Sequence, residues 1–455
     1  MLQFIKSNSL ISILLFCLVG GFLAFVQTQQ GFTYFPWEIK NHLIGQKLNQ
    51  GFRLYKDIRD NTGPFATGFY QLLDFFSFSI SANPYIAFSI ICLQAYLFQR
   101  CILQFDLMPK LGGLAFGIYL LLFHLTREFY VPDPALLGLT FLLLTWREII
   151  QQQKTLLVND RVFLVGVYLA TATLLFPAYF WVLPWAILSL LFYSGISIRQ
   201  IILVLIGYLF VITITSLVFS FRGNLPYLWQ VYRQSVFTFQ LISWEESKRV
   251  LLTFAPAFLL GIWGLYKVVG NPKIRAHAQK AQQTTIIWFF FSFLSMANFP
   301  AFHRINFVIL LPPLAYFGLN IFYVIKKNWQ KELVFVLLVA SVFILAKQDY
   351  KEGEMTIKQK PLLSISGQKL LVLGPEIDEY LHNEMAGPFV NWELAKPLLS
   401  QLNSYKNVIT VQEYFAKDQP TYIYDSEGYL PKIGQHLPSI TQQYVLVSPK
   451  LYRKK

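Results

Sequence analysis

The sequence predicts an all-α bundle of about 11 membrane-spanning helices, followed by a small C-terminal α/β domain outside the membrane. Three observations support this fold class. Of the 455 residues, 55% are hydrophobic and only 14% are charged, at a mean hydropathy of +0.45, which excludes an ordinary soluble protein. Most apolar residues gather into runs of membrane-spanning length. Residues 348–455 instead alternate short apolar and polar segments.

Eleven apolar runs predict the spanning helices, because each approaches the ~20 residues that cross a bilayer. They cover residues 9–26, 84–103, 111–126, 134–150, 161–177, 179–195, 200–220, 251–269, 285–300, 305–325 and 332–347. Residues 65–82 form a weaker run around Asp74, which predicts a helix at the interface or against the bundle. No small-residue cleavage site follows the first run, so we expect a retained helix rather than a signal peptide.

Lysine and arginine fall mainly in short loops that share one side of the membrane. This bias predicts a cytoplasmic N-terminus and an outer C-terminal tail in a bacterial inner membrane. Residues 347–455 carry 13 basic and 12 acidic residues, so nearly all of the net charge of +14 belongs to the membrane part. Eleven of its bases fall on the outer side, where topology does not require them. They favour an anionic ligand such as a lipid phosphate, and no basic soluble domain exists to bind nucleic acid.

The tail has the alternation of a small, parallel-leaning α/β sheet. We expect strands at residues 369–373, 407–411, 421–425 and 444–447, and helices at residues 378–385 and 412–417. Gly374 predicts a tight strand-to-helix turn rather than a phosphate-binding fingerprint. The tail contains no cysteine, so no disulfide framework is expected. We therefore divide the chain into a transmembrane domain, residues 1–347 with a long first outer loop at 27–83, and an outer domain, residues 348–455.

The polar segment of residues 36–64 carries more charge than a connector between helices needs. Glu38 follows Trp37, a typical interfacial anchor, shortly after the first apolar run ends. A carboxylate held at the membrane surface can act as a general base toward a hydroxyl group. The alternative is that Glu38 is a solvated loop acid.

The order of residues in the 36–64 segment resembles the first outer loop of the C-type (GT-C) integral-membrane glycosyltransferases, in the family 39-like branch. In that family an acid after the first helix precedes a run similar to xxGxxLYxDixDxxGP. The matching residues here are Glu38, Gly51, Leu54, Tyr55, Asp57, Asp60, Gly63 and Pro64. One difference is that many members carry Asp-Glu at the acid position, where this chain has Trp37-Glu38.

Two further segments resemble the same family. The stretch TREFYVPDP, residues 126–134, places Asp133 where the family has a second acid, although Asp before Pro is also a good helix N-cap. The stretch PAFHRINFVILLPP, residues 300–313, resembles the basic or aromatic pair ahead of a Leu-Pro-Pro run. Arg304 could there bind the departing phosphate or reach for lipid headgroups, and His303 could be a structural interfacial histidine.

The resemblance implies a GT-C-like fold and an enzyme that moves a hexose or pentose from a polyprenyl-phosphate donor to an acceptor hydroxyl, with inversion. The acceptor would be a glycan, lipid or protein at the outer face of the inner membrane. Glu38 would be catalytic, helped by Asp133 or Asp57. No cofactor is implied; a divalent metal is possible but not indicated. The implied phosphate ligands are Arg304, Arg53, Lys56 and Arg59, and the implied substrate contacts are Tyr55, Asp60, His303, Tyr232 and Arg233.

Two other classes of protein fit parts of the sequence. A transporter or flippase of lipid-linked glycans would place charged residues midway through its spans, whereas here they cluster at span ends. A non-catalytic GT-C-like assembly protein would have a degenerate site, and the Trp37-Glu38 pair is compatible with that. The aromatic segment of residues 221–250 suits an amphipathic helix on the bilayer, with an aromatic belt as the simpler role of its rings.

Overall fold

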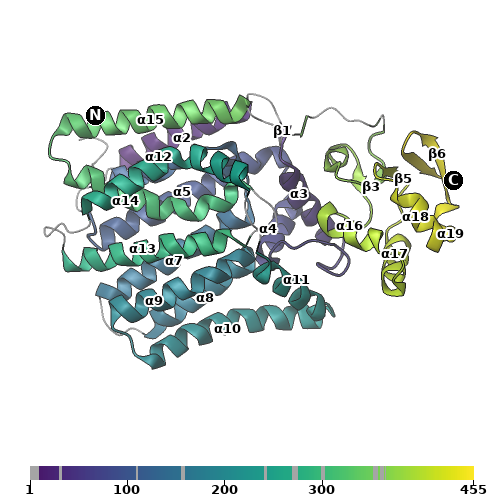
Figure 1. Cartoon of the computed structure of the whole chain (residues 1–455), viewed down its shortest axis with the longest axis horizontal. Helices are drawn as coiled ribbons and strands as arrows, with labels where there is room; N and C mark the ends of the chain where they lie inside the picture. The colour runs from purple at the N-terminus through teal and green to yellow at the C-terminus, as the bar shows by residue number, and fades with distance from the viewer. Residues whose placement is uncertain are drawn as a thin grey trace. The chain divides into compact units, whose positions relative to one another are not determined.

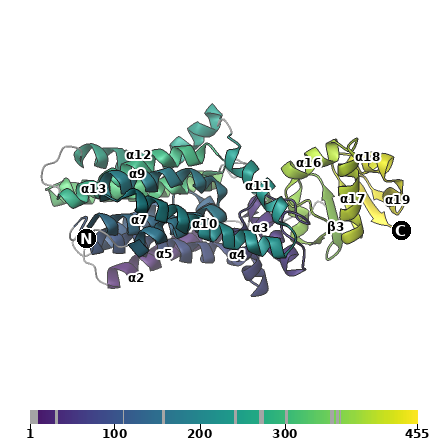
Figure 2. The same ribbon diagram turned by 90° about the horizontal axis from the view of Figure 1, so that it is seen from below.

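The computed structural model describes residues 10–29, 33–108, 111–154, 159–239, 243–268, 275–298, 303–351, 357–358, 363 and 365–455 (Figures 1 and 2). The chain forms two compact units. The first contains residues 1–30, 81–218 and 232–353, and the second contains residues 31–80, 219–231 and 354–455. Residues 9, 269 and 299–300 of the expected spans, residues 30–32 of the expected first loop, and residues 300–302 of the third family match lie outside the described ranges.

The first unit is a bundle of long helices whose axes run nearly parallel to one another (Figures 1 and 2). Its α-helices are α2 (Leu10–Gln29), α5 (Asn83–Gln104), α6 (Gly112–Leu122), α7 (Pro134–Lys154), α8 (Asn159–Leu175), α9 (Leu183–Ser194), α10 (Ile198–Phe221), α11 (Leu225–Phe237), α12 (Trp244–Val268), α13 (Ala276–Met296), α14 (Leu311–Val324) and α15 (Asn328–Lys351). Three short 3-10 helices, η2 (Arg127–Tyr130), η3 (Pro177–Val182) and η4 (Arg304–Leu310), precede α7, α9 and α14. The last turn of α10 and the first half of α11 belong to the second unit.

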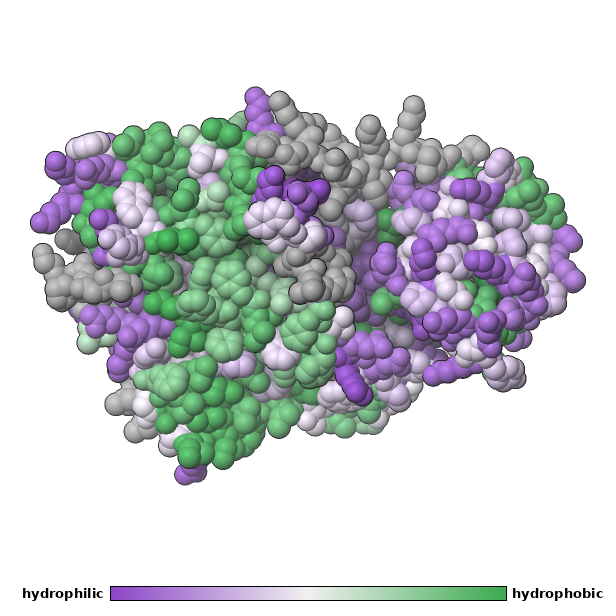
Figure 3. Space-filling view, in the orientation of Figure 1, coloured by the Kyte–Doolittle hydropathy of each residue, from purple (hydrophilic) through white to green (hydrophobic). Residues whose placement is uncertain are grey.

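The helices of the first unit confirm the expected membrane bundle. Among the described residues, six helices are long and apolar enough to cross a bilayer: Ile80–Gln104, Pro177–Ser194, Ile198–Phe221, Trp244–Val268, Arg304–Val324 and Asn328–Lys347. Figure 3 shows apolar residues covering the visible faces of these helices, as on α10, which exposes Ile202, Leu209 and Phe210. The chain is therefore a multi-pass membrane protein, while the total of about 11 spans stays a prediction.

Small residues and aromatic contacts stabilise the packing of the bundle. A Cβ at Gly264 of α12 would overlap the carbonyl oxygen of Phe317 of α14, so the two backbones can approach only because this residue is glycine. At the centre, the buried Trp146 ring lies 5.7 Å from Phe98 and 5.8 Å from Tyr316 between ring centroids. Close packing of this kind stabilises helix association in lipid, where the hydrophobic effect does not favour contacts between helices.

The second unit has a five-stranded sheet in the order β4-β3-β5-β7-β6. The strands are β3 (Lys369–Leu373), β4 (Glu384–Met385), β5 (Tyr422–Asp425), β6 (Tyr444–Ser448) and β7 (Leu451–Lys454). β3 is parallel to β4 and β5, whereas β7 is antiparallel to β5 and β6. A separate antiparallel pair joins β1 (Thr33–Tyr34) to β2 (Ile357–Lys358).

Helices cover both faces of this sheet, because neighbouring side chains of a strand point in opposite directions. Leu371 and Leu373 of β3 pack with apolar residues of α16 (Trp392–Ser400), α17 (Tyr405–Lys417), α18 (Tyr429–His436) and α19 (Pro438–Thr441). Leu370 and Val372 instead pack with Ile39, Leu43 and Ile44 of α3 (Pro36–Asn49). Residues of the expected first outer loop thus form one layer of the C-terminal α/β fold. The second helix of that loop, α4 (Pro64–Phe75), packs against α3 and is followed by the short η1 (Ile80–Ala82).

The expected elements of the tail are confirmed in part. The strands predicted at 369–373, 421–425 and 444–447 are present, as is the helix at 412–417. The strand predicted at 407–411 is wrong, because these residues lie in α17, where Val411 and Phe415 are one helical turn apart and buried. Residues 378–385 hold only the short η5 (Ile377–Leu381) and then β4. The strand β7 was not predicted from the sequence, because it has only four residues.

Candidate active site

Glu38 lies in the first turn of α3, where Pro36 starts the helix. One oxygen of its carboxylate accepts a 3.4 Å hydrogen bond from the backbone N–H of Phe35, the residue before the helix. Phe35 stacks on Trp37 with 4.5 Å between ring centroids, and Glu38 is only 5% exposed. A carboxylate in a first turn is also favoured by the helix dipole. Glu38 is therefore a buried, oriented helix residue and not a solvated loop acid.

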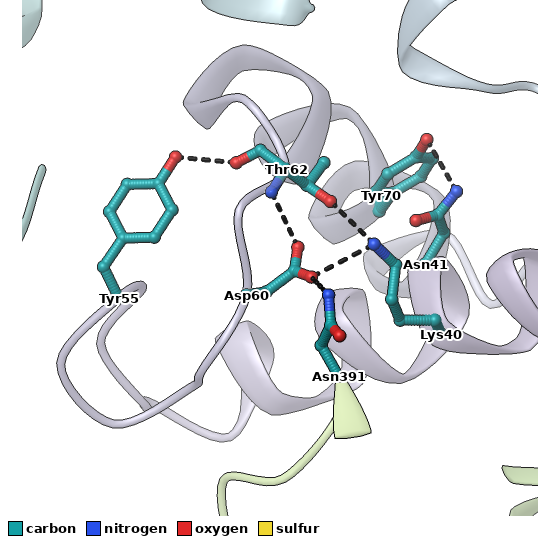
Figure 4. A network of polar contacts seen from close by, with 7 residues as sticks. All are labelled: Lys40, Asn41, Tyr55, Asp60, Thr62, Tyr70 and Asn391. Carbon is teal, nitrogen blue, oxygen red and sulfur yellow. Dashed lines mark hydrogen bonds and ion pairs between the residues drawn. The ribbon is translucent and has the colours of Figure 1, made fainter. Parts of the chain in front are cut away.

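Asp60 lies at the centre of a polar network in the second unit (Figure 4). Its Oδ1 is 3.0 Å from Lys40 Nζ and accepts a 3.2 Å hydrogen bond from Asn391, while its Oδ2 accepts the backbone N–H of Thr62 at 2.8 Å. Burial alone would raise the pKa of Asp60, but Lys40 and Thr62 outweigh it and hold the pKa below its usual value. The carboxylate stays ionised and joins the 36–64 segment to residue 391.

Tyr55 closes the same network from a strained backbone position. Its φ is +64°, in the left-handed region, and its hydroxyl donates a 2.6 Å hydrogen bond to the carbonyl of Thr62. The ring stacks on Phe219 with 5.9 Å between centroids. Tyr55 is buried, and its role as a substrate contact stays a prediction.

Asp57 is held by two bases of the second unit. Its Oδ2 lies 2.5 Å from Lys417 Nζ and 3.2 Å from Arg53 Nε, and it also accepts the backbone N–H of Arg53. Burial raises the pKa of Asp57, but these partners lower it further than burial raises it. A carboxylate with this pairing is a weak proton acceptor at neutral pH.

The basic residues of the 36–64 segment contact carboxylate, carbonyl and hydroxyl groups of the second unit. Arg53 pairs with Asp57, and the Arg59 guanidinium donates a 3.4 Å hydrogen bond to the carbonyl of Leu394. The carbonyl of Lys56 accepts the Tyr414 hydroxyl at 3.2 Å, and the Lys56 side chain is half-buried. The deepest base, Lys47, was not among the expected site residues. It is 2% exposed and its Nζ lies 2.7 Å from Asp418.

In the first unit, two short helices bring together acids and a base that are far apart in the sequence. Glu128 of η2 accepts the backbone N–H of Ile305 at 3.2 Å, and its other oxygen lies 3.8 Å from Nε of Arg304 on η4. Burial raises the pKa of Glu128 to about 7, although Arg304 opposes the shift, and nearby Asp133 adds to it. A buried carboxylate that titrates near neutral pH is typical of functional sites.

Asp133 caps α7, as its position before Pro134 predicts. Its Oδ1 accepts the backbone N–H of Ala135 at 2.9 Å, which satisfies one of the free amides of the helix start. The N-cap interpretation is therefore confirmed, and a catalytic role for Asp133 stays a prediction. Glu128 was not among the expected site residues, because nothing in the sequence shows that it contacts Arg304.

The remaining expected site residues lie just before η4 and within α11. His303 is the half-buried N-cap of η4, directly before Arg304. On α11, Tyr232 is half-buried and Arg233 is exposed. Their roles as substrate contacts stay predictions. Within the described residues, no three His, Cys, Asp or Glu side chains are grouped so that they could hold a metal ion.

Solved structures of two proteins have a similar fold. ArnT from Cupriavidus metallidurans bound to undecaprenyl phosphate matches with a TM-score of 0.60 at 12% identity, over 97% of both chains. Its apo form matches with a TM-score of 0.56 at 13% identity. The archaeal oligosaccharyltransferase AglB from Archaeoglobus fulgidus, in complex with an inhibitory peptide and a dolichol phosphate, matches with a TM-score of 0.50 at 12% identity, over 98% of this chain and 74% of that one.

These likenesses show the fold. The chain has the GT-C-type architecture, a helical membrane bundle with a small C-terminal sheet domain. No family model matches the chain, and no curated protein sequence matches it.

Proposed function

We propose that this protein is a membrane glycosyltransferase that moves a sugar from a polyprenyl-phosphate donor to an acceptor hydroxyl. The observation that carries the proposal is the fold shared over 97% of the chain with a protein that binds undecaprenyl phosphate. A second protein of this fold binds a dolichol phosphate. The family-like run in residues 36–64 points independently to the same class of donor. Fold alone does not determine activity, so the residues of the site must carry the chemistry.

In the proposed reaction the acceptor hydroxyl attacks the anomeric carbon from the face opposite the lipid phosphate. The new C–O bond forms as the bond between the sugar and the phosphate oxygen breaks, and the configuration inverts. The hydroxyl proton passes to a carboxylate, for which Glu38 is the best-supported acid of the 36–64 segment. Asp57 and Asp60 have lowered pKa values because of Lys417, Arg53 and Lys40, which makes them poor bases.

The departing lipid phosphate gains negative charge, which a guanidinium can stabilise through paired hydrogen bonds. We assign this role first to Arg304, with Arg53, Lys56 and Arg59 as further cations. His303, Tyr232 and Arg233 are proposed as donor contacts, and Asp133 as a helper of the base. The proposed setting is the outer face of a bacterial inner membrane, with the N-terminus in the cytoplasm and no bound cofactor.

The test begins with mass spectrometry of surface glycans and lipids from a deletion strain, which identifies the donor sugar and the acceptor. Transfer is then measured with the purified full-length protein in lipid nanodiscs, using that polyprenyl-phosphate sugar. We expect Glu38→Gln to lower kcat by about 100-fold or more, because a positioned base contributes ~10²–10⁴. Glu413→Gln, at an exposed acid of α17, is the matched control and should keep full activity.

Full transfer by the Glu38→Gln variant would remove Glu38 from the catalytic role. An unchanged set of glycans and lipids in the deletion strain, together with no transfer by the purified protein, would contradict the enzyme itself. Transport of a lipid-linked glycan across vesicles without transfer would identify the protein as a flippase. Loss of an unrelated membrane assembly in the deletion strain would indicate a non-catalytic role.

A further inference from the structure

The contact between η2 and η4 holds a carboxylate against the arginine that we assign to the donor phosphate. Glu128 is 6% exposed, and its Oε2 accepts the N–H of Ile305 at 3.2 Å. This bond anchors Glu128 to the residue that directly follows Arg304 in the chain. The carboxylate therefore keeps its place beside Arg304 even when the arginine side chain moves.

The charge contact between Glu128 and Arg304 is a loose one. Its 3.8 Å separation exceeds the 2.7–3.2 Å range of N–H···O hydrogen bonds, although the Arg304 side chain is only 15% exposed. A phosphate can form two short, parallel hydrogen bonds with a guanidinium, which are stronger than a single long contact. An incoming phosphate can therefore replace the carboxylate as the partner of the Arg304 guanidinium. The carboxylate stays buried at its place on η2, and without the guanidinium it is more stable when it is protonated.

We propose that Glu128 is a positioning residue, which holds Arg304 for the lipid phosphate and takes up one proton from water when the phosphate replaces it. This inference rests on the proposed function, because it takes a polyprenyl phosphate as the ligand of Arg304. One proton moves from solvent to a Glu128 oxygen in this step, and no bond of the lipid forms or breaks. Glu128 goes from carboxylate to carboxylic acid, and Arg304 stays protonated throughout.

The groups around Glu128 determine the sign of the pH dependence. Arg304 and Asp133 act on it directly, and burial sets its pKa at about 7. His124 contacts Tyr130 of η2. Arg127 directly precedes Glu128 in the chain, and His303 directly precedes Arg304. Helices α5 and α15 also contact η2, and their described charged side chains are Arg100, Lys331, Glu332 and Lys347.

Above pH 7 the ionised carboxylate competes with phosphate for Arg304, and below pH 7 the competition disappears. Glu128→Gln keeps an acceptor for the Ile305 N–H but lacks the charge at every pH. Linkage with a pKa of about 7 then predicts that this variant binds phosphate about tenfold more tightly than wild type at pH 8 and about equally at pH 6.

The probe is undecaprenyl phosphate, and its binding to the full-length protein in nanodiscs is measured by native mass spectrometry between pH 6 and pH 8. The phosphate of the lipid titrates in the same way for every variant. The ratio of the wild-type Kd to the Glu128→Gln Kd at one pH therefore reports only the effect of the Glu128 charge. Glu413→Gln, at an exposed acid of α17, is the matched control and should keep the wild-type Kd at both pH values. Arg304→Gln should weaken binding at both pH values.

A Kd ratio that stays near one at pH 8, or weaker binding by Glu128→Gln, would overturn the inference. If that variant does not fold, calorimetry of the wild type at pH 8 in two buffers of different ionisation enthalpy gives the answer. We expect uptake of about 0.9 proton per bound lipid, and no uptake would overturn the inference.

If the wild type does not bind undecaprenyl phosphate at all, the proposed donor class fails and this inference fails with it. Normal binding with a flat ratio overturns the inference alone.

Discussion

Replacement of Asp418 by Asn should destabilise the second unit strongly. Asp418 follows α17 and is 3% exposed. Its carboxylate lies 2.7 Å from Lys47 Nζ and 2.5 Å from Lys369 Nζ, and it accepts the backbone N–H of Gly387 at 2.8 Å. Lys47 is 2% exposed and lies 4.6 Å from the centre of the Phe52 ring. The pair therefore joins α3 to the C-terminal fold in a buried place.

The size of the effect follows from burial. Asparagine keeps the shape and can still accept the Gly387 N–H, so the main change is the loss of the charge. Burial already lowers the pKa of Lys47, and Asp418 is the partner that raises it. An uncompensated buried ammonium costs about 3–5 kcal/mol. At about 2–4 °C per kcal/mol for a unit of this size, the melting temperature should fall by about 6–20 °C.

Thermal unfolding of the purified protein in detergent gives the shift, and limited proteolysis assigns the transition to residues 354–455. The matched control is Glu427→Gln, because Glu427 pairs with Lys396 at 3.0 Å on an exposed surface of the same unit. Water screens that pair, so its loss should change little. Adding Lys47→Met to Asp418→Asn should recover part of the stability. A shift for Asp418→Asn no larger than that of the control would refute this account of the buried pair.

Two further predictions concern packing and pH. Gly264→Ala should lower the stability of the bundle by about 1–3 kcal/mol, because α12 and α14 must separate to admit the methyl group. Gly68→Ala, where an added Cβ meets no atom within 4 Å, should be neutral or slightly stabilising in the same melting assay. The folded-state pKa values of Asp57, Asp60 and Asp418 lie below their ordinary values, so their contribution is complete above about pH 4 and is lost as pH falls through the folded values. A melting temperature of the second unit that is constant from pH 6 to pH 3 would contradict this assignment.

The membrane bundle could be predicted because a long apolar run has few alternatives to a buried or lipid-facing helix. The number of spans could not be settled in the same way. The α6 helix, Gly112–Leu122, has only 11 residues, and α7, Pro134–Lys154, ends with charged and amide side chains. Length and hydropathy do not separate such helices into those that span and those that lie within the bundle.

The strands of the tail were predictable where short runs of aliphatic and aromatic residues lie next to glycine, proline or polar turn residues. The segment Asn407–Val411 was misassigned because β-branched residues are common in strands. Val408, Val411 and Phe415 have helical spacing, and α17 places this stripe against the core of the second unit. This helical spacing of apolar residues is visible only in a segment longer than residues 407–411.

The bases of the 36–64 segment were expected to bind a ligand because membrane topology does not require them. The tail is almost neutral, so the net charge of each region does not indicate that their charged residues pair with one another. In the structure, Asp57 pairs with Lys417, and Lys47 pairs with Asp418 across a sequence separation of 371 residues. Long-range pairs of this kind are set by the fold and leave no local pattern in the sequence.

These pairs change how a mutational scan of the 36–64 segment must be interpreted. Alanine at Asp57 or Asp60 would remove activity even if neither residue touches a substrate, because both carboxylates join this segment to residues 391 and 417. For Glu38, the hydrogen bond with the Phe35 N–H lies within one helix end, and the melting temperature tests whether its replacement also disturbs the unit. A variant that loses transfer while it keeps the melting temperature of the second unit therefore identifies chemistry. A variant that loses both identifies only the scaffold that holds the segment in place.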